Sequence, residues 1–208
     1  MKKETLQKRT KIANDIMYYI YTHIETNIDI EELSIDLGIS KFHMHRIFKE
    51  AFGKNIYESI KSIRLQKASN LLLTNKYSTI SNIVNQCGYS SQSSFIKIFK
   101  DRFEMTPKEW KNGGYKEYSQ KILQQSQRAS QSKADFKDIV PTIVKMPAIE
   151  SYYIRNKGYN INIKETWQKL QTWILTNDII SYKRIALFHD NPTITPLNEC
   201  QYIGCVMV

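Results

Sequence analysis

The chain has 208 residues, of which 41% are hydrophobic, and a formal net charge of +10. This apolar content is enough for a packed core, which excludes disorder throughout the chain, and without a run of about 18 apolar residues no membrane span is expected. Most of the positive charge lies in residues 1–116, which hold 19 basic and 12 acidic side chains, and a basic domain attracts polyanions such as nucleic acid. Three irregularly spaced cysteines argue against a disulfide framework and favour a cytoplasmic location.

The first expected element is an amphipathic helix over residues 8–26. Isoleucines four residues apart share one face of a helix, and here they are Ile12, Ile16, Ile20 and Ile24. Such a face is expected to pack against the elements that follow.

The residues from about 29 to 103 contain one unit twice. Gly38 and Gly88 lie 50 residues apart, and each follows a short apolar segment with helical periodicity. Beyond the glycines the offset becomes 51, so that Phe48 corresponds to Phe99, and one extra residue in the second turn explains the change. Two short helices joined by a glycine turn form a helix-turn-helix. The sequence therefore predicts two such units in tandem.

Each unit also carries signals for where its helices begin and end. Side-chain oxygens of Asp, Ser and Thr cap helix starts by accepting from free backbone N–H groups. The expected caps are Asp29, with Glu32 completing a capping box, and Ser40 in the first unit, and Ser78 or Thr79 and Ser90 or Ser91 in the second. The two glycines end the first helix of each unit, because glycine adopts a left-handed backbone at little cost.

The outward face of the second helix in each unit is largely polar and basic. It presents Phe42, His45, Arg46 and Lys49 in the first unit and Gln92, Ser93, Ile96, Lys97 and Lys100 in the second. In the major groove an arginine pairs with guanine and a glutamine with adenine, whereas lysines near the C-terminal end of the helix suit phosphate contacts. An ordinary solvated helix has a similar face, and the duplication is what favours DNA recognition.

Residues 56–73, between the two units, are expected to form one continuous helix. Its apolar positions are Ile60, Ile63, Ala68, Leu71 and Leu72, with Lys61, Arg64 and Lys67 outside. A helix of about 17 residues is roughly 25 Å long. It would hold two reading helices at close to one turn of DNA, about 34 Å.

Several motifs in the first half of the chain are distinctive: residues 30–40, Phe48-Lys49, Arg64, Cys87-Gly88-Tyr89 with Ser91, residues 95–100 with Phe103, and residues 106–110. Over about residues 8–112 they resemble the DNA-binding domain of the AraC/XylS family. The resemblance implies an all-α domain of seven helices that acts as a monomer. It also implies two recognition helices entering successive major grooves, and promoter binding that activates or represses transcription.

The resemblance extends to the roles of single residues. The base-reading set is Phe42, His45, Arg46, Gln92, Ser93, Ile96 and Lys97, in which apolar Ile96 would contact a thymine methyl or no base at all. We assign phosphate contacts to Ser40, Lys41, Lys49, Ser91, Lys100 and Arg64. Double-stranded DNA is the expected partner and RNA polymerase a further candidate. No cofactor and no enzymatic activity are expected.

The second half of the chain differs in composition. Residues 113–138 are rich in Ser and Gln, which is typical of a linker, and residues 139–208 form the remaining domain. Branched and aromatic residues predict strands at 139–146, 149–154, 185–188 and 202–208, and helical periodicity predicts a helix at 164–176. The expected fold of this part is a small α+β half-domain.

Motifs in the second half resemble the GyrI-like effector-binding domain. They are residues 144–147, Gly158-Tyr159, residues 167–170, residues 190–192 and residues 200–202. That domain has two similar halves around an apolar pocket, and only the first half is recognised here. Because the chain stops within an apparent strand, we expect a truncated domain with an exposed apolar edge. Such a half-domain would pair weakly with a second copy.

Three aromatic residues are candidates for an effector pocket: Tyr152, Tyr159 and Trp167. Ordinary core packing accounts for the same residues. The alternative function is a GyrI-type small-molecule-binding or hydrolytic module whose DNA-binding domain is vestigial. No catalytic set is recognised, and no metal site is expected, because His43 and His45 project about 200° apart on a helix.

Overall fold

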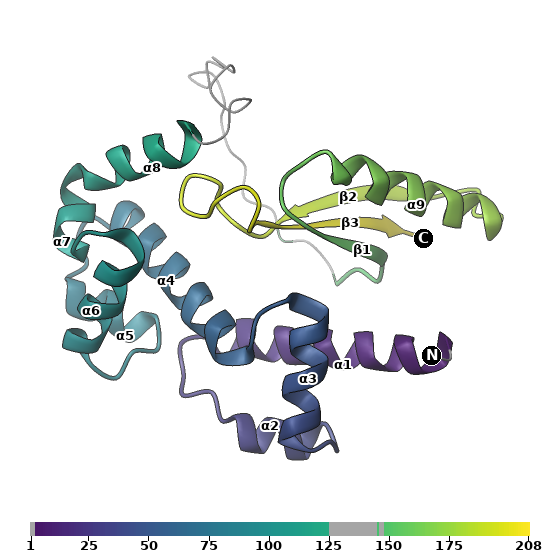
Figure 1. Cartoon of the computed structure of the whole chain (residues 1–208), viewed down its shortest axis with the longest axis horizontal. Coiled ribbons are helices and arrows are strands. Elements are labelled where there is room, and N and C mark those ends of the chain that lie inside the picture. Colours follow the sequence, from purple (N-terminus) through teal and green to yellow (C-terminus); the bar gives the residue numbers. More distant parts are fainter. Residues whose placement is uncertain (1–2, 125–144, 146–147) are drawn as a thin grey trace. The chain divides into compact units, whose positions relative to one another are not determined.

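The structure is a computed structural model that describes residues 3–124, 145 and 148–208 (Figure 1). It divides into two compact units, Met1–Tyr115 and Lys116–Val208. The first is helical, and the second combines helices with a sheet. The domain limits expected at residues 112 and 138 stay a prediction. Within the segment expected to be a linker, Tyr115–Gln124 forms helix α8.

Seven α-helices occupy residues 3–109 of the described chain, which agrees with the all-α domain expected there. They are α1 (Lys3–Thr22), α2 (Ile30–Asp36), α3 (Lys41–Phe52), α4 (Ile56–Thr74), α5 (Ile80–Gln86), α6 (Gln92–Phe103) and α7 (Pro107–Glu109). A π-helical turn, η1 (Trp110–Gly114), follows. Helix α1 begins earlier than expected and ends at Thr22, after which the N–H of Thr26 bonds the carbonyl of His23 in a turn.

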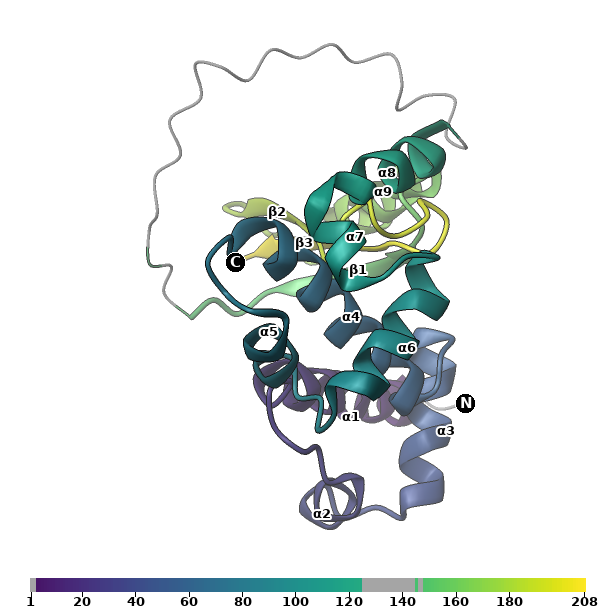
Figure 2. The ribbon, with the colours of Figure 1, turned by 90° about the vertical axis from the view of Figure 1, so that its left-hand side faces the viewer.

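The repeat seen in the sequence is present in the structure. Helices α2 and α5 have 7 residues each, and α3 and α6 have 12 each. Figure 2 shows the two helix pairs, and α4 connects them. Gly38 and Gly88 follow α2 and α5 with φ of 61° and 70°, the left-handed region that glycine tolerates best. Both units are therefore helix-turn-helices built on one plan.

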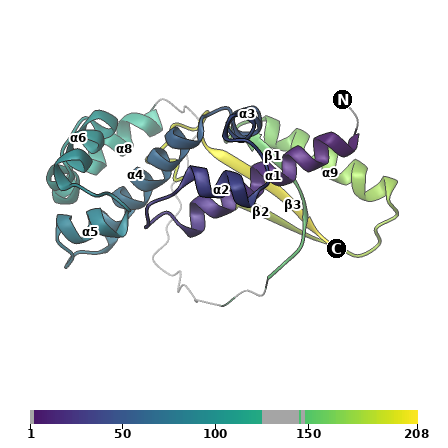
Figure 3. The same cartoon turned by 90° about the horizontal axis from the view of Figure 1, so that it is seen from below.

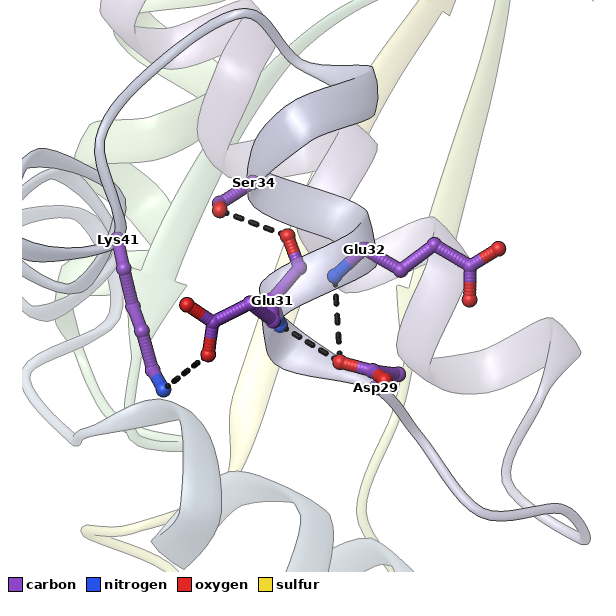
Figure 4. Close-up of polar contacts among 5 residues, drawn as sticks. All are labelled: Asp29, Glu31, Glu32, Ser34 and Lys41. Carbon is purple, nitrogen blue, oxygen red and sulfur yellow. Dashed lines mark hydrogen bonds and ion pairs between the residues drawn. The ribbon is translucent and has the colours of Figure 1, made fainter.

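Side-chain caps explain where these four helices begin. The cap oxygens belong to Asp29, Ser40, Thr79 and Ser91, and each accepts a backbone N–H two or three residues further on. The capping box expected for Glu32 is wrong. Figure 4 shows the Glu32 side chain directed away from Asp29, whose carboxylate instead accepts from the N–H groups of both Glu31 and Glu32.

The two helix-turn-helices have separate cores. In the first, the isoleucine face of α1 packs against α3, with Ile16 and Ile20 fully buried. In the second, the buried rings of Phe95, Phe99 and Phe103 extend in contact along α6 to Trp110. The indole Nε1 of Trp110 donates to the carbonyl of Ser69 at 3.1 Å, which anchors this second core to α4.

The described residues of the second unit form α8, three strands and helix α9 (Asn162–Thr176). The strands are β1 (Tyr152–Lys157), β2 (Lys183–Phe188) and β3 (Gln201–Met207), and they form an antiparallel sheet in the order β1-β3-β2. The expected helix and the last two strands correspond to α9, β2 and β3. Strand β1 lies about three residues later than expected. The strand expected at 139–146 lies outside the described residues except for Lys145, which is not in a strand.

Strand β3 corrects one expectation. We expected the last strand to be an exposed edge, but it is the centre of the sheet, paired with β1 on one side and β2 on the other. Its run from Tyr202 to Val206 is buried, which suits the unbroken apolar character of the segment. The order of strands depends on long-range pairing, which a local pattern does not encode.

Helix α9 covers one face of this sheet (Figure 1, Figure 3). Leu170 and Ile174 pack with Val206 of β3 in a small core. A Cβ built on Gly204 would lie 3.0 Å from a methyl of Thr166 and 3.2 Å from Leu170. The helix therefore approaches the central strand closely at this glycine.

Candidate nucleic-acid interface

Helix α3 presents an exposed face opposite its buried one. Met44, Ile47 and Phe48 are buried, which turns Phe42 and Arg46 to the outside, with the Phe42 side chain 79% exposed. The Arg46 guanidinium lies 3.0 Å from Nδ1 of His43 on the previous turn. Phe42 and Arg46 are four residues apart and so share one face of the helix, and an apolar ring and a guanidinium on one face suit contacts with the edges of bases.

His45 is less accessible than the sequence suggests. Its ring lies 5.6 Å from that of Tyr57, and burial, together with the charge of Lys41, lowers the pKa of His45 below its ordinary value. The imidazole is therefore neutral near pH 7 and can donate from one nitrogen and accept at the other. Tyr57 is a contact that the sequence analysis missed. The signal was the capping box of Asn55 and Glu58, which fixes the start of α4 and so places Tyr57 in its first turn.

The N-terminal turn of α3 is held by polar contacts (Figure 4). The Lys41 ammonium pairs with the Glu31 carboxylate of α2 at 3.1 Å, and that hydrogen bond raises the pKa of Lys41. Both side chains are exposed, and an exposed ion pair of this kind contributes little to stability. Lys41 can thus exchange Glu31 for a phosphate at little cost. The Ser40 hydroxyl accepts the N–H of His43 and keeps its own proton for donation.

Helix α6 repeats the arrangement with different side chains. Gln92, Ser93 and Lys97 are exposed, and Lys97 stands at the position equivalent to Arg46, whereas Ile96 is half-buried. Lys49 and Lys100 occupy equivalent exposed positions in the last turns of α3 and α6. The Ser91 hydroxyl caps the helix by accepting the N–H of Ser94. The predicted base-reading and phosphate residues of each unit therefore gather on one side of one helix.

Arg64 does not join this surface. Its Nε donates to the carbonyl of Ile24 at 3.1 Å, and its Nη2 donates to the carbonyl of Thr26 at 2.6 Å. Burial lowers the pKa of the guanidinium, and the ring of Tyr89 lies 5.9 Å from its central carbon. The structure does not support the predicted phosphate contact of Arg64, because this side chain faces the loop between α1 and α2.

The three aromatic residues proposed for an effector pocket lie in two settings in the second unit. Tyr152 packs against Trp173 with ring centroids 4.2 Å apart. The indole Nε1 of Trp167 donates to the hydroxyl of Tyr202 at 2.7 Å. The hydroxyl of Tyr159 donates to the carbonyl of Asp190 at 2.8 Å. The ring of Phe188 contacts both Tyr159 and Tyr202, at 5.1 Å from each. Trp167 and Tyr159 are thus joined through one aromatic chain, and Tyr152 packs elsewhere.

Among the described residues, none of the helices has the length and apolar content that crossing a lipid bilayer requires. The same part of the chain holds no group of three or more His, Cys, Asp or Glu side chains placed to bind a metal ion. Cys87, Cys200 and Cys205 are buried.

Two family models match the chain. A helix-turn-helix domain matches residues 33–113, and a GyrI-like small molecule binding domain matches residues 140–208. The probable transcription factor PqrA of Proteus vulgaris is 34% identical over 105 residues, which cover 50% of this chain and 85% of PqrA. The xylose operon regulatory protein of Escherichia coli (strain K12) is 34% identical over 96 residues, which cover 46% of this chain and 24% of that protein. The chain thus matches about a quarter of the length of the xylose regulator.

Among solved structures, the C-terminal domain of AraT, a response regulator from Geobacillus stearothermophilus, matches at 25% identity and a TM-score of 0.46. The match covers 49% of this chain and 84% of that domain.

Two helix-turn-helices joined by one helix, each with an exposed polar face on its second helix, define a tandem helix-turn-helix protein. Such a fold belongs to the class of proteins that read double-stranded DNA. The match to PqrA covers most of that relative. The chain belongs to the AraC family of helix-turn-helix transcription regulators and carries a GyrI-like small molecule binding domain.

Proposed function

We propose that this chain is a sequence-specific transcription regulator that reads successive major grooves of promoter DNA with α3 and α6. The observation that carries the proposal is the repetition of one exposed, basic twelve-residue helix on the same capped scaffold. A single polar helix face is common on any protein, whereas two equivalent ones held by a shared helix suit a repeating target.

The length of α4 supports this reading of DNA. Its 19 residues extend about 28 Å at 1.5 Å per residue, which is close to the roughly 34 Å that separates successive major grooves on one side of a duplex. Helices at the two ends of such a rod can address neighbouring grooves without bending the DNA strongly.

The chemistry of the exposed side chains assigns their roles. Arg46 suits a guanine, with two parallel N–H donors to O6 and N7, and Gln92 suits an adenine. Phe42, His45, Ser93, Ile96 and Lys97 complete the base-reading set. Lys41, Lys49 and Lys100, together with the capping hydroxyls of Ser40 and Ser91, would bond phosphates, which fix register without specifying sequence.

Selection of bound duplexes from a random DNA pool tests the proposal. A motif of about 15–20 base pairs with two conserved half-sites one helical turn apart is expected. Base changes in one half-site should then weaken binding as much as the loss of the Arg46 side chain does. Base changes in the other half-site should weaken binding as much as the loss of the Gln92 side chain. Enrichment of no common motif would contradict the proposed function.

We further propose that the second unit senses a small molecule. The support is the match to a GyrI-like small molecule binding domain, together with the aromatic chain from Trp167 to Tyr159. Titration with amphipathic cations, followed by tryptophan fluorescence, should give a saturable change that Trp167→Phe removes. A change that rises linearly without saturation would contradict an effector site. Saturable binding by a chain that selects no DNA motif would instead favour a small-molecule module with a vestigial DNA-binding domain.

On DNA we propose a monomer, because one chain supplies both recognition helices. Pairing of two second units is the alternative, and among the described strands the edge positions are those of β1 and β2 and not β3. Sedimentation at rising concentration distinguishes the two, since a constant monomer mass would exclude pairing through this unit. RNA polymerase is the candidate partner at the promoter.

A further inference from the structure

The turn between α5 and α6 meets the loop between α1 and α2 at one point. Gly88 lies in the turn between α5 and α6, and the carbonyl of Ile24 lies in the loop between α1 and α2. A Cβ built on Gly88 would lie 2.5 Å from that carbonyl oxygen and 2.8 Å from Nη2 of Arg64. The second helix-turn-helix therefore approaches backbone that belongs to the first, and only a residue without a side chain permits this distance.

The equivalent glycine of the first unit shows that this contact is not a general demand of the motif. Gly38 has nearly the same φ as Gly88, 61° against 70°, yet a Cβ there would meet nothing within 4 Å. Both positions require a left-handed backbone. At Gly88 the neighbouring atoms also leave no room for a side chain, whereas at Gly38 they do.

Arg64 completes the junction from the middle of α4. Its two donors hold the carbonyls of Ile24 and Thr26, and its guanidinium lies against the ring of Tyr89, the residue after Gly88. One turn along α4, Lys67 pairs with Glu25 of the same loop at 2.5 Å. One guanidinium thus touches both helix-turn-helices and the helix that connects them.

We propose that Arg64 and Gly88 are positioning residues that set the angle between α3 and α6, and hence the half-site spacing that the chain accepts. The inference rests on the proposed function. The chain runs from one reading helix to the other through α4 and α5, and the junction adds a contact outside that path. Two binding elements gain affinity from being linked only when their geometry allows both to engage at once. A rigid junction therefore favours binding at one spacing between the half-sites and weakens binding at longer or shorter spacings.

The experiment compares three duplexes from the selected motif: both half-sites at the natural spacing, both with one base pair added between them, and one half-site alone. Binding is measured by fluorescence anisotropy at several salt concentrations. The variants are Arg64→Lys, which keeps the charge and loses the planar pair of donors, and Gly88→Ala. Gly38→Ala is the control for Gly88→Ala, since it imposes a similar left-handed strain without the clash.

Arg64→Lys should change the affinity for the single half-site by no more than about twofold, but weaken binding to both half-sites at the natural spacing about tenfold. The reason is that the second recognition helix is then held at a lower effective concentration near its half-site. For the same reason, the added base pair should weaken binding of this variant less than binding of the unaltered chain. Gly88→Ala should act the same way and Gly38→Ala should not. Tyr89→Leu serves as a second probe of the junction if Gly88→Ala does not fold.

Three results would overturn the proposal. Equal weakening on all three duplexes with a salt slope lower by about 0.9 would make Arg64 a phosphate contact. An unchanged preference for spacing in Arg64→Lys and Tyr89→Leu would show that α4 alone sets the geometry. Equal effects of Gly38→Ala and Gly88→Ala on spacing would show that backbone strain is the cause. If the unaltered chain does not prefer two half-sites over one, the proposed function fails before the junction is tested.

Discussion

Replacing Arg46 by alanine should change which sequences the chain prefers while leaving its fold intact. The side chain is exposed and its hydrogen-bond contact is His43 on the same helix. No cavity forms and no buried group loses a partner, so the free energy of unfolding should change by less than about 0.5 kcal/mol. The loss of a bidentate contact to guanine should cost about 1–3 kcal/mol of binding at that base pair, or roughly 5- to 150-fold in affinity.

Lys49→Ala provides the matched control, since Lys49 lies on the same face of α3 one turn further on. It should weaken binding to all sequences alike and lower the salt slope by about 0.9, the contribution of one phosphate. Competition binding with the selected site, with the same site altered at the proposed guanine, and with random DNA separates the two roles. Equal losses for Arg46→Ala on selected and random DNA would refute its role in base reading.

Three further outcomes follow from contacts within the first unit. Trp110→Phe should lower the free energy of unfolding by about 1–3 kcal/mol, because it removes the buried hydrogen bond from the indole to the carbonyl of Ser69 and puts a smaller ring in a fully buried position; guanidinium denaturation measures this, and an unchanged midpoint would contradict it. Asn55→Ala removes the side-chain oxygen that accepts the N–H of Glu58, while its own backbone N–H still donates to the Glu58 carboxylate, and should cost about 1 kcal/mol in thermal unfolding, whereas Asn55→Asp should retain most of the stability. The lowered pKa of His45 means that the unfolded chain takes up a proton first as the pH falls below about 6.5, so stability should decline from there toward the lowered pKa. Urea unfolding at pH 7.5, 6.5 and 5.5 should show a shallower decline for His45→Gln, and an equal decline in both proteins would assign the effect to other groups.

Much of the helical half could be predicted because its signals are local. The caps Asp29, Ser40, Thr79 and Ser91 satisfy backbone groups within three residues of themselves, and Gly38 requires only a backbone angle. Their information is contained in a few neighbouring residues. The boundaries of α2, α3, α5 and α6 follow from these signals.

The features that sequence analysis missed depend on distant partners. Arg64 occupies an outward position on the expected helix, but the carbonyls that hold it lie 40 and 38 residues earlier. Strand β3 has the pattern of a buried strand, yet whether it pairs on one side or two depends on β1 and β2. For the candidate site, the faces of α3 and α6 could be recognised from periodicity, whereas the packing of His45 against Tyr57 could not.

Because α3 and α6 have the same length and equivalent serine caps, the outward side chains of one helix can be transferred to the other. The helix ends differ in one respect: α3 is closed by Gly53 and α6 by Glu104, both with a left-handed backbone. Grafting the four outward side chains of α3 onto α6 would leave the aromatic interior beneath untouched. A chain altered in this way should recognise the same base sequence in both half-sites, so that its preferred operator would be a direct repeat instead of an asymmetric site.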